Sequence, residues 1–168
     1  TCPVMGAVPR SGDLKIPSRH LGLVQASEQY GLDDLINRAA RHVGAACDLD
    51  AIIAAASAVQ TGSVHPVPPL GQRISVARDD ACRFSYWHML EEWRAQGADL
   101  SFFSPLADEA ADDSADAIFL PGGYPELHAG RLAGAERFRR SILAAQTRGA
   151  LIYGECGGYM VLGQGLVD

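Results

Sequence analysis

The sequence predicts an α/β fold in which a parallel sheet is flanked by helices, and three observations support this prediction. From residue 73 onward, short apolar runs of strand length alternate with segments of helical periodicity. Gly97 and Gly149 end two of these helical segments just before the next strand. Hydrophobic residues make up 48% of the 168 residues, which is enough to bury the core of a domain. Strands that alternate with helices form a parallel sheet covered on both faces.

The N-terminal third is expected to hold one strand and two helices. The run "PVMGAVPR", residues 3–10, is typical of a short strand that leads into a turn. A brief apolar stretch follows at 21–24, and apolar residues then recur at helical spacing over 28–46. Asp48 or Asp50 can cap a second, alanine-rich helix with the sequence "LDAIIAAASAV".

The segment "QTGSVHPVPPLGQ" lies between the two halves, contains two glycines and three prolines, and has no periodic pattern. Such a composition is typical of a linker. We therefore predict a first domain over residues 1–60, a linker over 61–72 and a second domain over 73–168.

The second domain is expected to alternate strictly between strands and helices. Helices are predicted over 83–96 and, with a basic face, over 127–148. On the first of them, Phe84, Trp87 and Leu90 recur at helical spacing and are expected in the core, although a ligand-facing or interface role is the alternative. The predicted strands are residues 73–78, 98–103, 115–120 and 150–153.

Composition and charge exclude several classes of function. A net charge of −6 argues against a nucleic-acid partner. No apolar run approaches the roughly 18 residues of a membrane span, and no signal peptide opens the sequence. The four cysteines are scattered without a CxxC pair, which argues against a zinc or dithiol site and favours reduced thiols in a cytoplasmic protein. The acidic run at 108–113 is expected to be a solvated loop rather than a metal site.

One cysteine follows a predicted strand directly. The stretch "GECGG", residues 154–158, fits the G-x-nucleophile-x-G elbow, in which glycines allow a strand and a helix to pass closely. Such a turn would expose the sulfur of Cys156 at the carboxyl end of the sheet and at a helix N-terminus, where a thiolate is stabilised. The alternative is a small buried residue in a glycine-rich bend.

A second loop, "LPGGYPE", follows another predicted strand and should open on the same edge of the sheet. Backbone N–H groups at Gly122 and Gly123 can turn towards an oxyanion, with the N–H of Gly157 as a further donor. The alternative is a plain turn at a strand exit. Together the two loops favour an acyl-transfer site.

The segments "LPGGYPELHAGRLA" and "GECGGYMVLGQGL" resemble the glutamine amidotransferase domain of the cobyrinic acid a,c-diamide synthases, including the hydrogenobyrinic acid form. Upstream, "LKIPSRHLGLV" and "RISVARDDACRFSYW" extend the resemblance over nearly the whole chain. It implies a class I-type, flavodoxin-like domain in which Cys156 attacks glutamine to form a thioester. Gly123 and Gly157 would supply the oxyanion-hole amides, with Gly122 beside them.

The resemblance also implies a two-part enzyme in which ATP and magnesium activate the a- and c-side-chain carboxylates of a corrinoid. Residues 1–60 match the tail of a dethiobiotin synthetase-like ATP-binding domain, and no phosphate loop is present. Arg19 and His20 would face the nucleotide or the interdomain surface, with a structural turn as the alternative. ATP and magnesium would be held mainly outside this chain, and a homodimer is one assembly left open.

The chain looks like a fragment of that enzyme. The family's catalytic histidine lies downstream of the cysteine, and none of the five histidines here matches it. We expect these 168 residues alone to be inactive as a synthetase and nearly inactive as a glutaminase.

Four other readings stay open. Cobyric acid synthase and the nickel-sirohydrochlorin a,c-diamide synthase share this kind of amidotransferase domain. A DJ-1-like cysteine hydrolase or redox sensor also has an elbow cysteine, and a non-catalytic binding domain would make Cys156 incidental.

Overall fold

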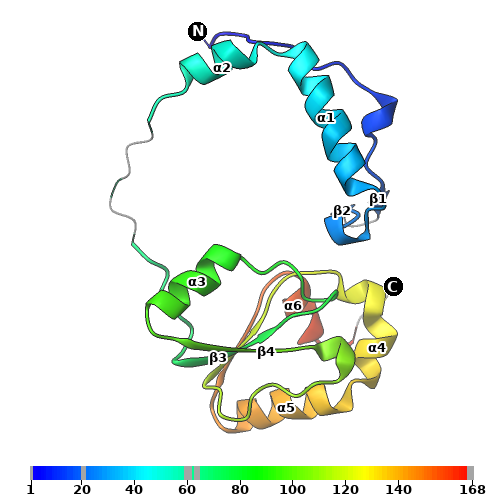
Figure 1. Cartoon of the computed structure of the whole chain (residues 1–168). Helices are drawn as coiled ribbons and strands as arrows, with labels where there is room; N and C mark the ends of the chain where they lie inside the picture. The colour runs from blue at the N-terminus through cyan, green and yellow to red at the C-terminus, as the bar shows by residue number, and fades with distance from the viewer. Residues whose placement is uncertain (1, 20–21, 59–61, 63–64, 166–168) are drawn as a thin grey trace. The chain divides into compact units, whose positions relative to one another are not determined.

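The computed structural model describes residues 2–19, 22–58, 62 and 65–165 (Figure 1). The chain divides into two compact units, Thr1–Gly62 and Ser63–Asp168. Among the described residues, no helix has both the length and the apolar character needed to cross a bilayer.

The N-terminal unit is built around helix α1 (Leu32–Ala46), which is followed by the short helix α2 (Leu49–Ala55). Asp48 caps α2, because its Oδ1 accepts the N–H of Ala51 at 2.9 Å. The remaining elements are η1 (Gly12–Leu14), the antiparallel pair β1 (Ser18–Arg19) and β2 (Gly22–Leu23), and η2 (Ala26–Glu28).

The strand expected at residues 3–10 does not form. Gly6 makes only an isolated bridge with Cys47, and a β-carbon at Gly6 would stand 2.6 Å from the Ala46 carbonyl oxygen. The segment therefore runs along the end of α1 without a partner strand. Within the described part of this unit, Leu35 is the one buried hydrophobic side chain.

The C-terminal unit contains a four-stranded parallel sheet with strand order β4-β3-β5-β6. All four predicted strands are confirmed to within two residues at either end. Their observed bounds are β3 (Arg73–Ala77), β4 (Asp99–Phe103), β5 (Ala117–Leu120) and β6 (Leu151–Gly154).

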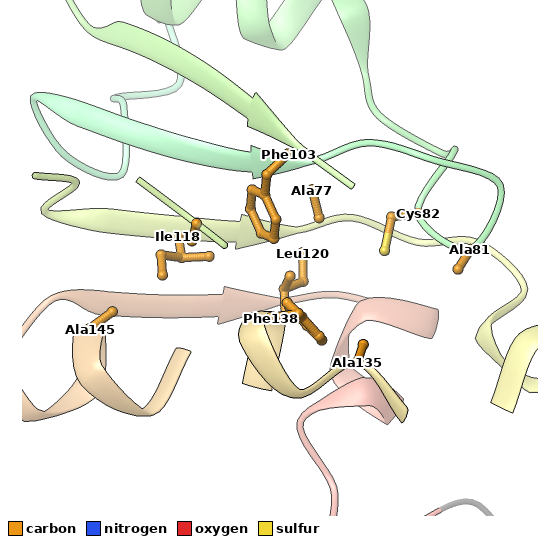
Figure 2. Close-up of a cluster of buried hydrophobic side chains, with 10 residues drawn as sticks. Ala77, Ala81, Cys82, Phe103, Ile118, Leu120, Ala135, Phe138 and Ala145 are labelled. Atoms are coloured by element: carbon orange, nitrogen blue, oxygen red, sulfur yellow. The ribbon is translucent and has the colours of Figure 1, made fainter. Parts of the chain in front are cut away.

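Helices cover both faces of this sheet (Figure 1). On one face, α3 (Trp87–Ala95) packs Leu90 and Trp93 against residues of β3 and β5 such as Phe119. On the other face, α5 (Glu136–Thr147) contributes Phe138 and Ala145 to a second cluster, which Figure 2 shows below Phe103, Ile118 and Leu120. The two central strands are buried on both faces, and this explains their nearly continuous apolar sequence.

In the N-terminal unit, α1 begins at Leu32 rather than at residue 28, and α2 ends at Ala55. The two helices predicted for the C-terminal unit also have different bounds in the structure. The helix expected over 83–96 begins at Trp87, because the Phe84 N–H donates to the Gly122 carbonyl and keeps that segment extended. The core placement was also wrong for two of its side chains: Phe84 is 40% exposed and Trp87 is 55% exposed, whereas Leu90 is buried.

The helix expected over 127–148 is two helices, preceded by the 3₁₀ helix η4 (Pro125–His128). The first, α4 (Ala129–Gly134), ends before Ala135, and α5 then starts anew. The cause lies in the acidic loop: Asp108 Oδ1 accepts the N–H of Phe138 at 2.9 Å in the first turn of α5. This carboxylate is therefore a cap rather than a solvated loop residue.

Candidate active site

Cys156 occupies the turn between β6 and the short helix α6 (Gly157–Val161). Its side chain is exposed, and its backbone angles are φ 51° and ψ −120°. L-residues rarely adopt a positive φ, and such strain concentrates at functional sites. The exposed thiol on a strained turn has the form that the elbow motif predicts.

Close backbone packing explains why glycines surround this cysteine. A β-carbon at Gly158 would stand 1.9 Å from the Leu120 carbonyl oxygen, and one at Gly157 would stand 2.7 Å from the Gly123 oxygen. Real β-carbons do not approach other atoms this closely, so both positions require glycine. The first turn of α6 thus rests directly on the end of β5.

The loop after β5 lies against the cysteine, as the sequence predicts. A β-carbon at Gly122 would lie 3.2 Å from the Cys156 β-carbon. The N–H of Glu155 donates to the Leu120 carbonyl at 3.1 Å, which fixes the cysteine turn to the strand end. Gly122, Gly123, Cys156 and Gly157 therefore meet at the carboxyl edge of the sheet, where open α/β sheets bind ligands.

Two amides of this cluster are free to donate. In the described part of the chain, neither the Gly123 nor the Gly157 N–H donates a hydrogen bond to a protein acceptor. The two amides are close, since a β-carbon at Gly157 would stand 3.0 Å from the Gly123 nitrogen. Such an arrangement can bind an oxygen that becomes negatively charged during attack by the neighbouring thiol.

The loop after β3 also reaches this cluster, which the sequence did not reveal. The Phe84 N–H donates to the Gly122 carbonyl at 2.9 Å, and the Phe84 ring meets Tyr124 edge to face with 5.2 Å between centroids. A β-carbon at Gly123 would stand 2.0 Å from the Ala81 oxygen. Three loops therefore converge at one point. A single sequence carries no signal for it, because the Phe84–Gly122 and Ala81–Gly123 contacts are made by backbone atoms.

Asp79 holds the β3 loop in place. Its Oδ2 accepts the Ser104 hydroxyl at 2.9 Å and the Leu106 N–H at 2.7 Å, and its Oδ1 accepts the Ala81 N–H at 2.9 Å. Nearby, burial and the negative charge of Asp79 raise the pKa of the Cys82 thiol from 9.0 to about 12. Cys82 is buried and unreactive, in contrast to the exposed Cys156.

Two further site residues, Arg19 and His20, are predicted in the N-terminal third of the chain. Arg19 belongs to β1 in the N-terminal unit, and His20 lies outside the described residues. No histidine of the described residues makes a hydrogen bond with Cys156, and His42 Nε2 instead lies 2.8 Å from the Pro9 carbonyl oxygen. In that part of the chain, no group of three or more potential ligands is arranged to hold a metal ion.

Comparison with known proteins adds to this geometry. Residues 73–168 match the CobB/CobQ-like glutamine amidotransferase domain. The chain is 55% identical over 170 aligned residues to the hydrogenobyrinate a,c-diamide synthase of Brucella abortus biovar 1, which covers 99% of the chain. It is 54% identical to the synthases of the same name from Rhizobium meliloti and Rhodobacter capsulatus, each covering 98% of the chain.

These relatives are much longer proteins. The chain spans 39% of the length of the Brucella abortus and Rhizobium meliloti relatives and 38% of that from Rhodobacter capsulatus. No solved structure matches the chain.

Proposed function

Because the chain belongs over residues 73–168 to the CobB/CobQ-like glutamine amidotransferase domain family, we propose that it hydrolyses glutamine at Cys156 and supplies ammonia for an amidation. The observation that carries the proposal is the exposed Cys156 on a strained turn beside the free N–H groups of Gly123 and Gly157. These are a nucleophile and an oxyanion site within one cluster.

The chemistry requires two steps at the sulfur. The Cys156 thiolate attacks the side-chain amide carbon of glutamine, and the amide oxygen gains negative charge opposite the Gly123 and Gly157 N–H groups. The carbon–nitrogen bond then breaks, the leaving nitrogen takes up the proton that the general base removed from the thiol, and ammonia departs while a glutamyl thioester remains. Water then attacks the thioester and releases glutamate and the thiol.

The proton acceptor for the thiol is not among the contacts of Cys156 in the described residues. We place the general base, a histidine, outside residues 1–168. The 168-residue chain should then show almost no steady-state glutamine hydrolysis, although its thiol can still react once with an electrophile that resembles glutamine.

For the longer protein we propose amidation of the a- and c-side-chain carboxylates of cobyrinic or hydrogenobyrinic acid in cobalamin biosynthesis. The support is the name shared by the relatives, hydrogenobyrinate a,c-diamide synthase, together with the ammonia source proposed above. ATP and magnesium would drive that ligase reaction in the cytoplasm. The described residues do not fit either group, because they hold no metal-ligand cluster and the sequence has no phosphate loop.

A glutamine-mimicking chloroketone tests the thiol step on this chain. We expect one adduct, located at Cys156 by peptide mass spectrometry and prevented by glutamine. Cys2 is the other exposed cysteine, so Cys2→Ser is the matched control and should be labelled as the wild type is, whereas Cys156→Ser should not be labelled. Equal labelling of Cys2, or labelling that glutamine does not slow, would contradict the proposal.

The amidation is tested separately in a full-length protein that contains this chain. With hydrogenobyrinic acid, ATP and magnesium, Cys156→Ser should abolish diamide formation from glutamine and retain it from ammonium salts. If a folded Cys156→Ser variant forms no diamide from either glutamine or ammonium salts, Cys156 acts in more than the glutaminase step.

A further inference from the structure

One carboxylate oxygen in the loop after β5 is buried without a hydrogen-bond partner. It is Oε2 of Glu126, on the 3₁₀ helix η4, and within the described part of the chain it neither accepts a hydrogen bond nor forms an ion pair. In that part, Gln25 Oε1 and Trp93 Nε1 are the other buried side-chain atoms without a partner. A carboxylate costs more free energy to leave unpaired than an amide or an indole does, so Glu126 is the most unusual of the three.

Glu126 directly follows the residue at which the two loops of the candidate site touch. Pro125 Cδ lies 2.7 Å from the position of a β-carbon on Gly157, and that β-carbon would also stand 3.0 Å from the Gly123 nitrogen. The helix η4 packs against α6, the helix that begins after Cys156. The unpaired carboxylate therefore lies one residue beyond the contact that brings the two free amides together.

The partner that this carboxylate lacks is a cation or an N–H donor. Arg131, five residues further along the chain, does not supply it, because its guanidinium donates to the Leu106 carbonyl at 2.9 Å. Glu126 as a whole is only half-buried, and its second oxygen, Oε1, is not enclosed as Oε2 is. The carboxylate can therefore accept a donor that comes from outside the protein without leaving its place.

Glutamine carries a donor of this kind. Its α-ammonium is joined to the side-chain amide carbon through four bonds of about 1.5 Å, so the two groups lie roughly 5 Å apart when extended. With the amide oxygen at the Gly123 and Gly157 N–H groups, the ammonium would lie about one residue further along the loop, where Glu126 stands. A charge-assisted hydrogen bond to a partly desolvated carboxylate is also stronger than one made in water.

We propose that Glu126 binds the α-ammonium of glutamine and selects amides that carry this group over amides that lack it. The inference rests on the proposed glutamine hydrolysis at Cys156 and adds a specificity residue to it. Glu126 takes no part in the bond changes at the sulfur. An amide without the ammonium leaves the carboxylate unpaired, and a site built to pair a polar group rejects such a molecule.

Two chloroketones that differ in one group test the proposal on the 168-residue chain: the glutamine analogue with its α-amino group, and the same compound without it. The rate constant for alkylation of Cys156 is measured by peptide mass spectrometry. In Glu126→Gln we expect the amino compound to react about tenfold more slowly than in the wild type, and the other compound to react at an unchanged rate.

Glu155→Gln is the matched control, because it removes a negative charge from the residue next to Cys156. It should change the rates of both chloroketones by the same factor. Urea unfolding gives a second measurement: Glu126→Gln should be as stable as the wild type or more stable, since no hydrogen bond within the described residues is lost. A clearly less stable variant would give the carboxylate a structural role and overturn the inference.

An unchanged rate of the amino compound in Glu126→Gln, or equal slowing of both compounds, would also overturn it. If labelling of Cys156 is still prevented by glutamine in that variant as in the wild type, this inference fails and the glutaminase proposal stands. If neither chloroketone reacts at Cys156 in the wild type, the glutaminase proposal fails, and this inference fails with it.

Discussion

The carbonyl oxygen of Leu120 lies 1.9 Å from the place where a β-carbon on residue Gly158 would stand. The same oxygen accepts the N–H of Glu155 at 3.1 Å. The end of β5 and the first turn of α6 therefore pack backbone against backbone, and this contact sets the position of the cysteine between them.

Gly158→Ala should destabilise the C-terminal unit by about 2–4 kcal/mol, because the added methyl group forces the two backbones apart. Urea unfolding followed by circular dichroism measures the change. The control is Gly130→Ala, which places a methyl group in open space on α4 and should be neutral or slightly stabilising. Equal effects of the two variants would mean that the close contact does not exist.

Replacing the strained Cys156 by glycine should give a more stable protein than replacing it by alanine. Cys156 has φ 51°, which glycine adopts without penalty, so Cys156→Gly should gain about 1–2 kcal/mol relative to Cys156→Ala. Comparing these two variants removes the thiol from both. An alanine variant as stable as the glycine variant would indicate that the turn relaxes once the sulfur is gone.

Asp79→Ala should destabilise the unit by about 2–3 kcal/mol, because three donors from the loops after β3 and β4 lose their acceptor. Asp113 is an exposed aspartate on the loop before β5, and Asp113→Ala is the control for the loss of one charge. Denaturant midpoints of the two variants give the comparison. The hypothesis fails if both aspartates contribute equally.

The Cys82 thiol should make stability depend on alkaline pH. Burial, followed by the charge of Asp79, raises its pKa in the folded state from 9.0 to about 12. Its contribution is therefore fully present below pH 9.0 and is lost as the pH rises through about 12, since the unfolded thiol ionises first. The decrease in the urea midpoint from pH 7 to pH 10 should be larger for the wild type than for Cys82→Ala. An equal decrease in both proteins would show that groups other than Cys82 cause the loss of stability.

Much of the sheet was predictable because its two central strands are buried on both faces and because glycines that end helices precede β4 and β6. Gly97 and Gly149 both have positive φ, as their position after α3 and α5 requires. The errors arose where a contact distant in sequence outweighs periodicity. Phe84 has helical spacing, but its pairing with Gly122 keeps the segment extended. Asp108 looks like an ordinary loop residue, but it starts a helix thirty residues later.

The sequence predicted which loops form the candidate site, but not the contacts within it. The motifs around Cys156 and Gly122 correctly indicated two strand ends on one edge, because parallel strands all point their carboxyl ends the same way. The sequence could not show the free N–H groups of Gly123 and Gly157, since that depends on which acceptors the surrounding backbone atoms have engaged. Residues 1–60 remain assigned to an ATP-binding domain only by prediction.

The backbone contacts from Ala81 to Gly123, and from Gly123 to Gly157, run in series across the strand ends, and the Phe84 hydrogen bond reinforces them. Because these contacts leave no room for a side chain at Gly123 or Gly157, a shift of the β3 segment should also displace the thiol.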